Sequence, residues 1–141
     1  MLDNIEEQER TPEEIHNVSM FLDLRDKMTH YANLKAKEDF LTFVKIFAPT
    51  IVSDFKMGRH IELLCNKLQG VVDGRTKRLM VFLPPRSSKS VVCSKLFPAW
   101  YIGKNPNHEI LTVSHSDQLS SDFGRSVRDI VNQEKFADMF P

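Results

Sequence analysis

One short stretch limits the possible folds of this chain more than any other. Residues 79–83 read Leu-Met-Val-Phe-Leu, a continuous apolar run of strand length, and Pro84 and Pro85 end it abruptly. Such a run is typical of a strand buried on both faces. A short polar loop follows, and a helical apolar pattern begins at about Ser90. The order strand, loop, helix predicts an α/β fold.

The rest of the chain predicts helices and one further strand. Thr11-Pro12-Glu13-Glu14 forms a capping-box start, which predicts a helix to about Tyr31. The segment between the apolar run and the second predicted strand is long enough for a crossover connection, which is right-handed in almost all proteins. The other predicted elements are helices at 38–47 (ended by Pro49), 58–72 (ended by Gly74), 90–102 (kinked or interrupted by Pro98), 116–131 and about 136–140, and a strand at 110–113.

The net charge of zero conceals two regions of opposite sign. Residues 1–40 carry ten Asp/Glu against five Lys/Arg, whereas residues 41–141 carry nine against fourteen. Composition alone favours a solvated surface with an acidic arm folded onto it, and the alternative is a polyanionic partner for the basic region. The overall balance therefore does not exclude nucleic-acid binding.

Composition and cysteine content limit the cellular compartments in which the protein is expected. No apolar run approaches the roughly 18 residues that a membrane-spanning helix needs, and the acidic start MLDNIEEQER is no signal peptide. Cys65 and Cys93 are too few and too far apart for a disulfide framework. These features predict a protein of a reducing compartment with no membrane contact.

The loop after the apolar run carries the residue types that bind phosphate. Such a loop needs a strand before it, a helix N-terminus behind it, a lysine for the outer phosphates and a Ser/Thr hydroxyl for Mg²⁺. Residues 83–90 read L-P-P-R-S-S-K-S, so Lys89 and Ser90 fit the pattern G-x-x-x-x-G-K-[ST], but Leu83 and Ser88 replace its glycines. On these eight residues alone, a plain helix cap is the simpler interpretation.

A longer stretch resembles a known family. Residues 78–90, followed by KLFPAWYIGKNP at 95–106, look like the Walker A region of the large terminase subunit of tailed phages. That family typically shows a hydrophobic strand, Pro-Pro-Arg-x-Gly-Lys-Ser and then Phe-Pro-Ala-Trp. The resemblance extends upstream to His60 and downstream through 114–128 to Phe140-Pro141. Residues before about 45 resemble nothing that we can place.

The resemblance implies the ATP-driven motor that packs viral DNA into an empty capsid and cuts the DNA concatemer. It implies a partial P-loop NTPase fold, with a helical lead-in over 1–50 and an incomplete ATPase domain over 51–141. The implied cofactors are ATP and Mg²⁺. Double-stranded DNA, the portal protein and the small terminase subunit are the implied partners, and the cytoplasm of a bacterial host is the implied location.

The resemblance also implies roles for single residues. Lys89 would contact the β- and γ-phosphates, Ser90 would hold Mg²⁺ through its hydroxyl, and the backbone around them would cradle the phosphates. Arg86 would act as a catalytic arginine that senses or stabilises γ-phosphate charge in cis; the alternative is a surface cation beside a turn. The full implied nucleotide-binding set is Pro85, Arg86, Ser87, Ser88, Lys89 and Ser90.

Other candidate residues each have a structural alternative, which we favour for all but His60. Trp100 and Tyr101 are candidates for base stacking, but core packing behind the loop explains them better. His115 follows the second predicted strand, where α/β proteins place ligand loops, and a solvated histidine is the simpler view. His60 fits an adenine pocket or a helix cap equally well. A basic set that faces DNA, a neighbouring subunit or only solvent comprises Arg59, Lys67, Arg75, Lys77 and Arg78.

Two departures from the family limit these expectations. If the loop needs a positive φ at Ser88, the side chain costs about 1–2 kcal/mol, which would lower nucleotide affinity roughly five- to thirtyfold. The second departure is the absence of an apolar run followed by Asp-Glu, the Walker B pattern that hydrolysis requires, and of a nuclease acidic cluster. Hydrolysis by this chain alone is therefore not expected.

These departures leave three hypotheses. The chain is the N-terminal fragment of a packaging ATPase truncated before the Walker B strand, a catalytically inactive module that binds nucleotide or DNA, or a prophage relic that pairs with a separate C-terminal half. In each case both predicted strands would lack their proper neighbours. Unpaired apolar strands invite association, so we expect marginal folding or a sheet completed by another chain, including by self-association.

Overall fold

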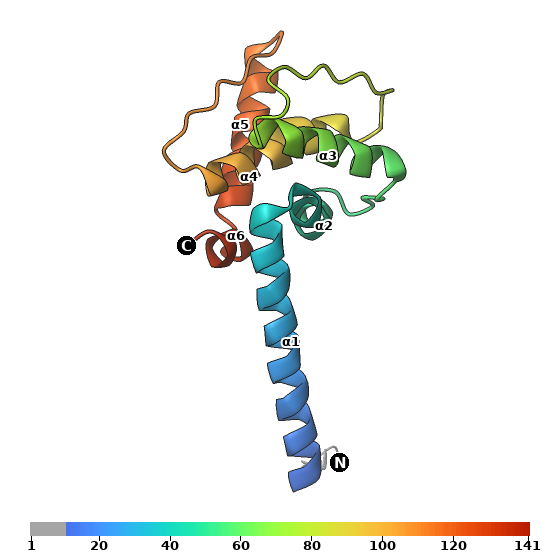
Figure 1. Ribbon diagram of the computed structural model, residues 1–141, viewed down its shortest axis with the longest axis vertical. Coiled ribbons are helices and arrows are strands. Elements are labelled where there is room, and N and C mark those ends of the chain that lie inside the picture. The colour runs from blue at the N-terminus through green and yellow to red at the C-terminus, as the bar shows by residue number, and fades with distance from the viewer. Residues whose placement is uncertain (1–10) are drawn as a thin grey trace, which may run out of the picture. The chain divides into compact units, whose positions relative to one another are not determined.

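The first helix begins where the sequence places its capping box. The computed structural model describes residues 11–141 and shows Thr11 N donating to Glu14 Oε2 at 2.8 Å, while Glu14 N donates to Thr11 Oγ1 at 3.4 Å. Helix α1 spans Pro12–Glu38, seven residues beyond the predicted end at Tyr31 (Figure 1). The chain divides into two compact units between Ala32 and Asn33, within α1.

The second unit has an aromatic core built on helix α2, Phe40–Ile51. Asp39 caps this helix by accepting a hydrogen bond from Thr42 N at 2.8 Å. Pro49 lies inside the last turn instead of ending the helix before it. Proline here removes the N–H that would bond to the carbonyl of Lys45, an exposed residue four positions earlier. The predicted apolar face is confirmed, with Phe40, Phe43, Val44 and Phe47 fully buried.

Helix α3, Arg59–Val72, packs against α2 and confirms the predicted boundaries. Gly58 is its N-cap, and its buried residues Ile61, Leu64, Cys65 and Leu68 recur at helical spacing. Gly74 ends the turn that follows with a φ of +74°. That conformation is readily available to glycine and is a frequent helix stop.

The helix after the polar loop runs from Lys89 to Lys104 and changes its winding on the way. Residues Val91–Leu96 form a π-helical turn, η1, in which Phe97 N donates to Val92 O, and α4 continues over Phe97–Lys104. Pro98 lacks the N–H that a regular α-turn would use, so the widened turn before it replaces the predicted kink. The inner side of the helix buries Val92, Leu96, Ala99 and Trp100.

Two helices complete the second unit. Helix α5 spans Asp117–Val131, and Ser116 caps it by accepting a hydrogen bond from Leu119 N at 3.3 Å. Helix α6 spans Glu134–Met139 and buries Phe136 and Met139. Both helices confirm the sequence predictions. Their apolar residues join the same core, since the rings of Phe136 and Phe43 lie 6.3 Å apart, edge to face.

The predicted α/β fold, and with it the partial P-loop NTPase fold, is wrong. Residues 11–141 contain no strand or sheet. The segments 79–83 and 110–113, predicted as strands, are loop segments, and within the described residues neither makes a backbone–backbone hydrogen bond. A strand needs a second extended segment at hydrogen-bonding distance, which this part of the chain does not provide.

The apolar run is covered on one face only. Leu79, Val81 and Leu83 are half-buried and pack on the core, whereas Met80 and Phe82 are 79% and 82% exposed. A groove of about 180 Å³ separates the run from α3. A continuous apolar run shows that burying both of its faces would be favourable. It does not show that the fold provides neighbours to bury both of them.

None of the helices described between residues 11 and 141 combines the length and apolar character that crossing a bilayer requires.

Candidate phosphate-binding loop

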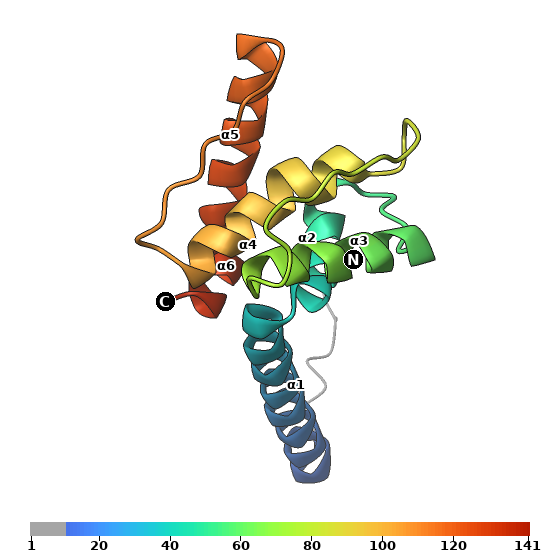
Figure 2. The same ribbon diagram turned by 45° about the horizontal axis from the view of Figure 1, so that its top comes forward.

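The chain reverses direction at residues 84–88, between the apolar run and the helix that starts at Lys89. Figure 2 shows this reversal at the tip of the segment that leads into the yellow helix. The loop and the first helical residues enclose a hollow of about 320 Å³ lined by residues 84–91. The local order of loop and helix therefore follows the sequence prediction, although no sheet supports it.

The loop has alternating backbone handedness. Arg86 and Ser88 have φ angles of 61° and 57°, and Ser87 between them is not in the positive-φ region. A left-handed residue beside a right-handed one is the backbone arrangement of anion-binding nests, in which successive N–H groups face one side. Positive φ is uncommon for residues other than glycine and costs of order 1–3 kcal/mol, and such strain is concentrated at functional sites.

Several N–H groups around the hollow make no hydrogen bond to the backbone of the described residues. Within residues 11–141, none of the amides of residues 86–91 donates to a backbone carbonyl, and the first helical bond of this kind is Val92 N to Ser88 O at 3.1 Å. The hydroxyl oxygen of Ser87 is fully buried and has no partner in the same part of the chain. Buried polar groups normally find a partner, so the hollow offers donors to a bound anion.

Lys89 and Ser90 stand at the start of the helix with their polar groups available. The ammonium of Lys89 makes one long hydrogen bond, 3.4 Å, to the carbonyl of Leu83. A bond of this length is weak, so the ammonium can turn toward a phosphate at little cost. Ser90 is exposed, and its side chain makes no capping bond. Both residues lie where the motif requires them.

Arg86 lies at the rim of the same hollow. Its side chain is exposed, and within the described chain it takes part in none of the ion pairs. An unpaired guanidinium beside an amide nest adds positive charge where a phosphate would lie. The structure thus groups Pro85, Arg86, Ser87, Ser88, Lys89 and Ser90 around one concave surface.

The strain at Ser88 predicts the effect of a glycine. The left-handed conformation is already present without ligand, so its cost of about 1–2 kcal/mol falls on folding instead of on nucleotide affinity, contrary to the sequence-based expectation. Ser88→Gly removes this strain, but it also raises the conformational entropy of the unfolded chain, which costs about 0.5–1 kcal/mol of stability. We expect a stabilisation of up to about 1 kcal/mol in urea unfolding, with little change in ligand affinity.

Ser90→Gly is the matched control, because Ser90 has an ordinary helical φ of −67°. The Ser90→Gly variant should be less stable by about 0.5–1 kcal/mol, since glycine raises the entropy of the unfolded chain and there is no strain at this position to relieve. Equal losses at positions 88 and 90 would contradict a strained loop.

The other sequence candidates do not join the loop. Trp100 is fully buried in the core, and Tyr101 shares a hydrogen bond of 2.9 Å with His108 Nδ1. His60 makes no side-chain cap on α3 and lines the groove beside the apolar run. His115 is exposed in the loop before α5. None of these four residues lines the hollow of the loop.

A set of exposed cations precedes the apolar run. Only Arg75 in this set makes an ion pair within residues 11–141, with Asp73 at 2.5 Å. The remaining members are therefore available to an external anion or to solvent. The set comprises Arg59, Lys67, Arg75, Lys77 and Arg78, all exposed.

The two cysteines are poor candidates for reactive groups. Burial raises the pKa of the Cys65 thiol to about 12, with a smaller contribution from the charge of Asp39. Burial also raises the pKa of Cys93, which the charge of Lys89 partly offsets. Both side chains are therefore neutral thiols near pH 7, and neutral thiols are weak nucleophiles and weak metal ligands.

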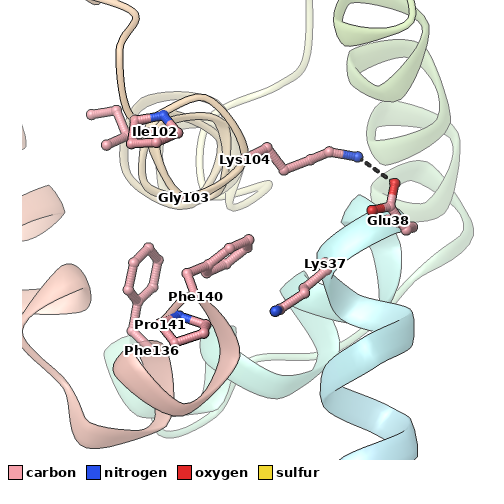
Figure 3. Close-up of a pocket in the computed structure, with 9 residues that line it drawn as sticks. Lys37, Glu38, Ile102, Gly103, Lys104, Phe136, Phe140 and Pro141 are labelled. Carbon is pink, nitrogen blue, oxygen red and sulfur yellow. Dashed lines mark hydrogen bonds and ion pairs between the residues drawn. The ribbon is translucent and has the colours of Figure 1, made fainter.

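A larger hollow of about 420 Å³ lies elsewhere in the second unit, between the end of α1, the end of α4, and α6. In Figure 3, Lys104 reaches Glu38 across its rim, an ion pair of 2.7 Å, and the rings of Phe136 and Phe140 form an apolar wall. Glu38 and Lys104 neutralise each other, and Lys37, which also lines this hollow, takes part in none of the ion pairs of the described residues.

Residues 83–91 bring no carboxylate to the loop. The lining of the hollow contains no Asp or Glu, and in the described chain no three His, Cys, Asp or Glu side chains are arranged to hold a metal ion. The loop thus has the groups for binding a phosphate, whereas a group that would activate water is not among its lining residues.

Two features of the site were not anticipated from the sequence. No pattern in the sequence indicates the positive φ of Arg86, because arginine rarely adopts that conformation. The buried hydroxyl of Ser87 also follows only from the folded loop. The run Pro-Pro-Arg-Ser-Ser indicates a turn but does not specify which residues take the left-handed region.

Comparisons with known proteins give no relatives. No family model, curated protein or solved structure matches the chain.

Proposed function

We propose that this chain binds the phosphates of a nucleotide through residues 83–90 and corresponds to the N-terminal part of the large terminase subunit of a tailed phage or prophage. In that role it contributes the ATP-binding loop of a motor that packages viral DNA. The observation that carries the proposal is the group of amides at residues 86–91 that make no backbone–backbone hydrogen bond within residues 11–141, directly before and at the start of a helix that opens with Lys89-Ser90.

The groups in the loop fit a nucleotide phosphate chain. The amides and the Ser87 hydroxyl are donors, and Lys89 and Arg86 supply positive charge, whereas phosphate oxygens are acceptors with negative charge. Residues from Pro85 to Ser90 would hold the phosphates. The hydroxyl of Ser90 would meet a Mg²⁺ ion that arrives with the nucleotide, because Mg²⁺ in such sites is held mainly by phosphates and water. Bound Mg²⁺ would neutralise phosphate charge.

The proposal is binding without turnover by this chain alone. Hydrolysis needs a carboxylate or an equivalent group that orients the attacking water, and the lining of the loop supplies none. A catalytic role for Arg86 therefore belongs to an assembly in which other residues complete the site. By the same resemblance, such an assembly includes the portal protein and the small terminase subunit.

Double-stranded DNA is the second proposed ligand. The observation that favours it is the set of exposed cations from Arg59 to Arg78, of which only Arg75 is paired within the described residues. Exposed Lys and Arg side chains neutralise backbone phosphates, and such binding weakens as salt is added. This ligand would bind outside the nucleotide loop, because none of these cations lines the hollow.

A titration of the chain with a fluorescent ATP analogue and Mg²⁺ tests the proposed nucleotide site. We expect saturable binding that unlabelled ATP displaces and that adenosine does not, because the loop recognises phosphates and not the base. Pyrophosphate should compete as well. Absence of saturable binding, or equal displacement by adenosine, would remove the support for a phosphate-binding loop.

A further inference from the structure

Helix α1 exposes many apolar side chains that no part of the structure covers. Between residues 18 and 34, eight large apolar residues are between 42% and 71% exposed. Isolated apolar residues on a surface are normal, whereas a continuous set on one helix marks an interaction surface. The eight residues are Val18, Met20, Phe21, Leu22, Leu24, Met28, Tyr31 and Leu34.

Four of these residues have the spacing of a helix–helix seam. Phe21, Leu24, Met28 and Tyr31 follow one another at steps of three, four and three residues. That spacing is the a/d pattern of a coiled coil over two heptads. A shallow apolar hollow along this face, lined by Phe21, Leu24, Met28 and Ala32 among others, shows that the seam is open. The face therefore matches a second helix of similar length.

We propose that α1 pairs with α1 of a second copy of this chain in antiparallel orientation. When Leu24 lies opposite Met28 of the partner copy, the same register places Phe21 opposite Tyr31. The seam then consists of four layers, each of which contains one residue from an a position and one from a d position. A self-complementary interface of this kind has the two-fold symmetry that is commonest among dimers.

The charge distribution of α1 favours the antiparallel orientation. Residues 12–24 contain three acidic and no basic residues, whereas residues 25–38 contain four basic and two acidic. Antiparallel pairing places the acidic half of each helix beside the basic half of the other, while parallel pairing would align like charges. The helix dipoles would also oppose each other.

The cations nearest the symmetry axis are already neutralised within each chain. Lys27 pairs with Asp23 at 2.7 Å, and Arg25 pairs with Asp26 at 3.2 Å. Their proximity across the axis therefore adds little repulsion. Two heptads form a short seam, so the dimer should be reversible and depend on concentration.

Sedimentation of the full chain over a micromolar concentration series tests the proposal, together with three variants. Leu24→Glu places a charge in the seam and should raise the dissociation constant at least about tenfold, because two carboxylates per dimer would lose water. Leu22→Glu is the matched control on the same helix outside the seam and should leave dimerisation unchanged. Circular dichroism of both variants checks that α1 remains helical.

Lys35→Glu tests the orientation. In the antiparallel register given above, residue 35 lies opposite Asn17 of the partner copy and one helical turn from its Glu14, so the new carboxylate should weaken the dimer severalfold, whereas in a parallel pair it would exchange one like-charge contact for another. A monomer at every concentration, or a dimer that Leu24→Glu leaves intact, would overturn the proposal. A dimer that Lys35→Glu leaves unchanged would overturn the antiparallel orientation.

Discussion

Replacing Lys89 with alanine is expected to weaken binding of Mg·ATP by about ten- to a hundredfold. Hydrogen bonds to charged groups contribute about 1.5–3 kcal/mol, and 1.4 kcal/mol corresponds to a factor of ten in affinity. The stability of the chain should change little, because the only hydrogen bond that the Lys89 side chain makes within the described residues is the 3.4 Å contact with Leu83 O. Fluorescence titration gives the affinity, and urea unfolding gives the stability.

Lys95→Ala is the matched control for this variant. Lys95 lies on the same helix, within η1, and does not line the hollow of the loop. Its removal takes away one positive charge from the same helix and should change the affinity less than about threefold, because a half-buried charge outside the loop is still partly screened by salt. Equal losses for both lysines would mean that net charge, and not the loop, attracts the nucleotide.

Replacing Trp100 with alanine is expected to cost about 3–5 kcal/mol of unfolding free energy, the usual range for truncation of a large buried aromatic residue. Trp100 is fully buried, its ring centroid lies 5.1 Å from that of Phe40, and its Nε1 donates to Ala36 O at 2.8 Å. Ala36 O is near the end of α1, and Phe40 N donates instead to Gln69 Oε1. The indole therefore satisfies a carbonyl that the helix leaves free.

Trp100→Phe separates the contribution of apolar packing from that of the indole hydrogen bond. It keeps most of the apolar volume but leaves the carbonyl of Ala36 unpaired, so we expect a loss of about 1–3 kcal/mol. Tyr101→Phe, which removes an exposed hydroxyl contact with His108, should cost no more than about 0.5 kcal/mol. Circular dichroism must be the probe, because Trp100 is the only tryptophan. A loss below about 1 kcal/mol for Trp100→Ala would contradict the core described here.

The helices could be predicted from the sequence because their signals are local. The Thr11–Glu14 capping box, the apolar spacing of α3 and the Ser116 cap each depend on contacts within a few residues. The burial of Trp100 was also anticipated, because it lies on the inner side of its helix. The end of α1 was missed, since its last turn is held by Trp100, which is far away in sequence.

The sheet could not be predicted because a strand is not a local property. The run at 79–83 has the apolar pattern of a strand, yet within residues 11–141 it finds cover on one face and no partner for its backbone. The loop was predicted in place and residue type. Its two left-handed residues, Arg86 and Ser88, depend instead on how the chain must turn from the run into the helix.

The backbone amides of the loop give the most direct test of nucleotide binding. A ¹⁵N-labelled sample can be titrated with Mg·ATP while the chemical shift of each amide is followed. We predict that the largest changes fall on residues 86–91, whose amides make no backbone–backbone hydrogen bond within the described chain, and that amides of residues 13–32 do not move. Shifts that leave residues 86–91 unchanged, or no shifts at all, would contradict a phosphate-binding loop.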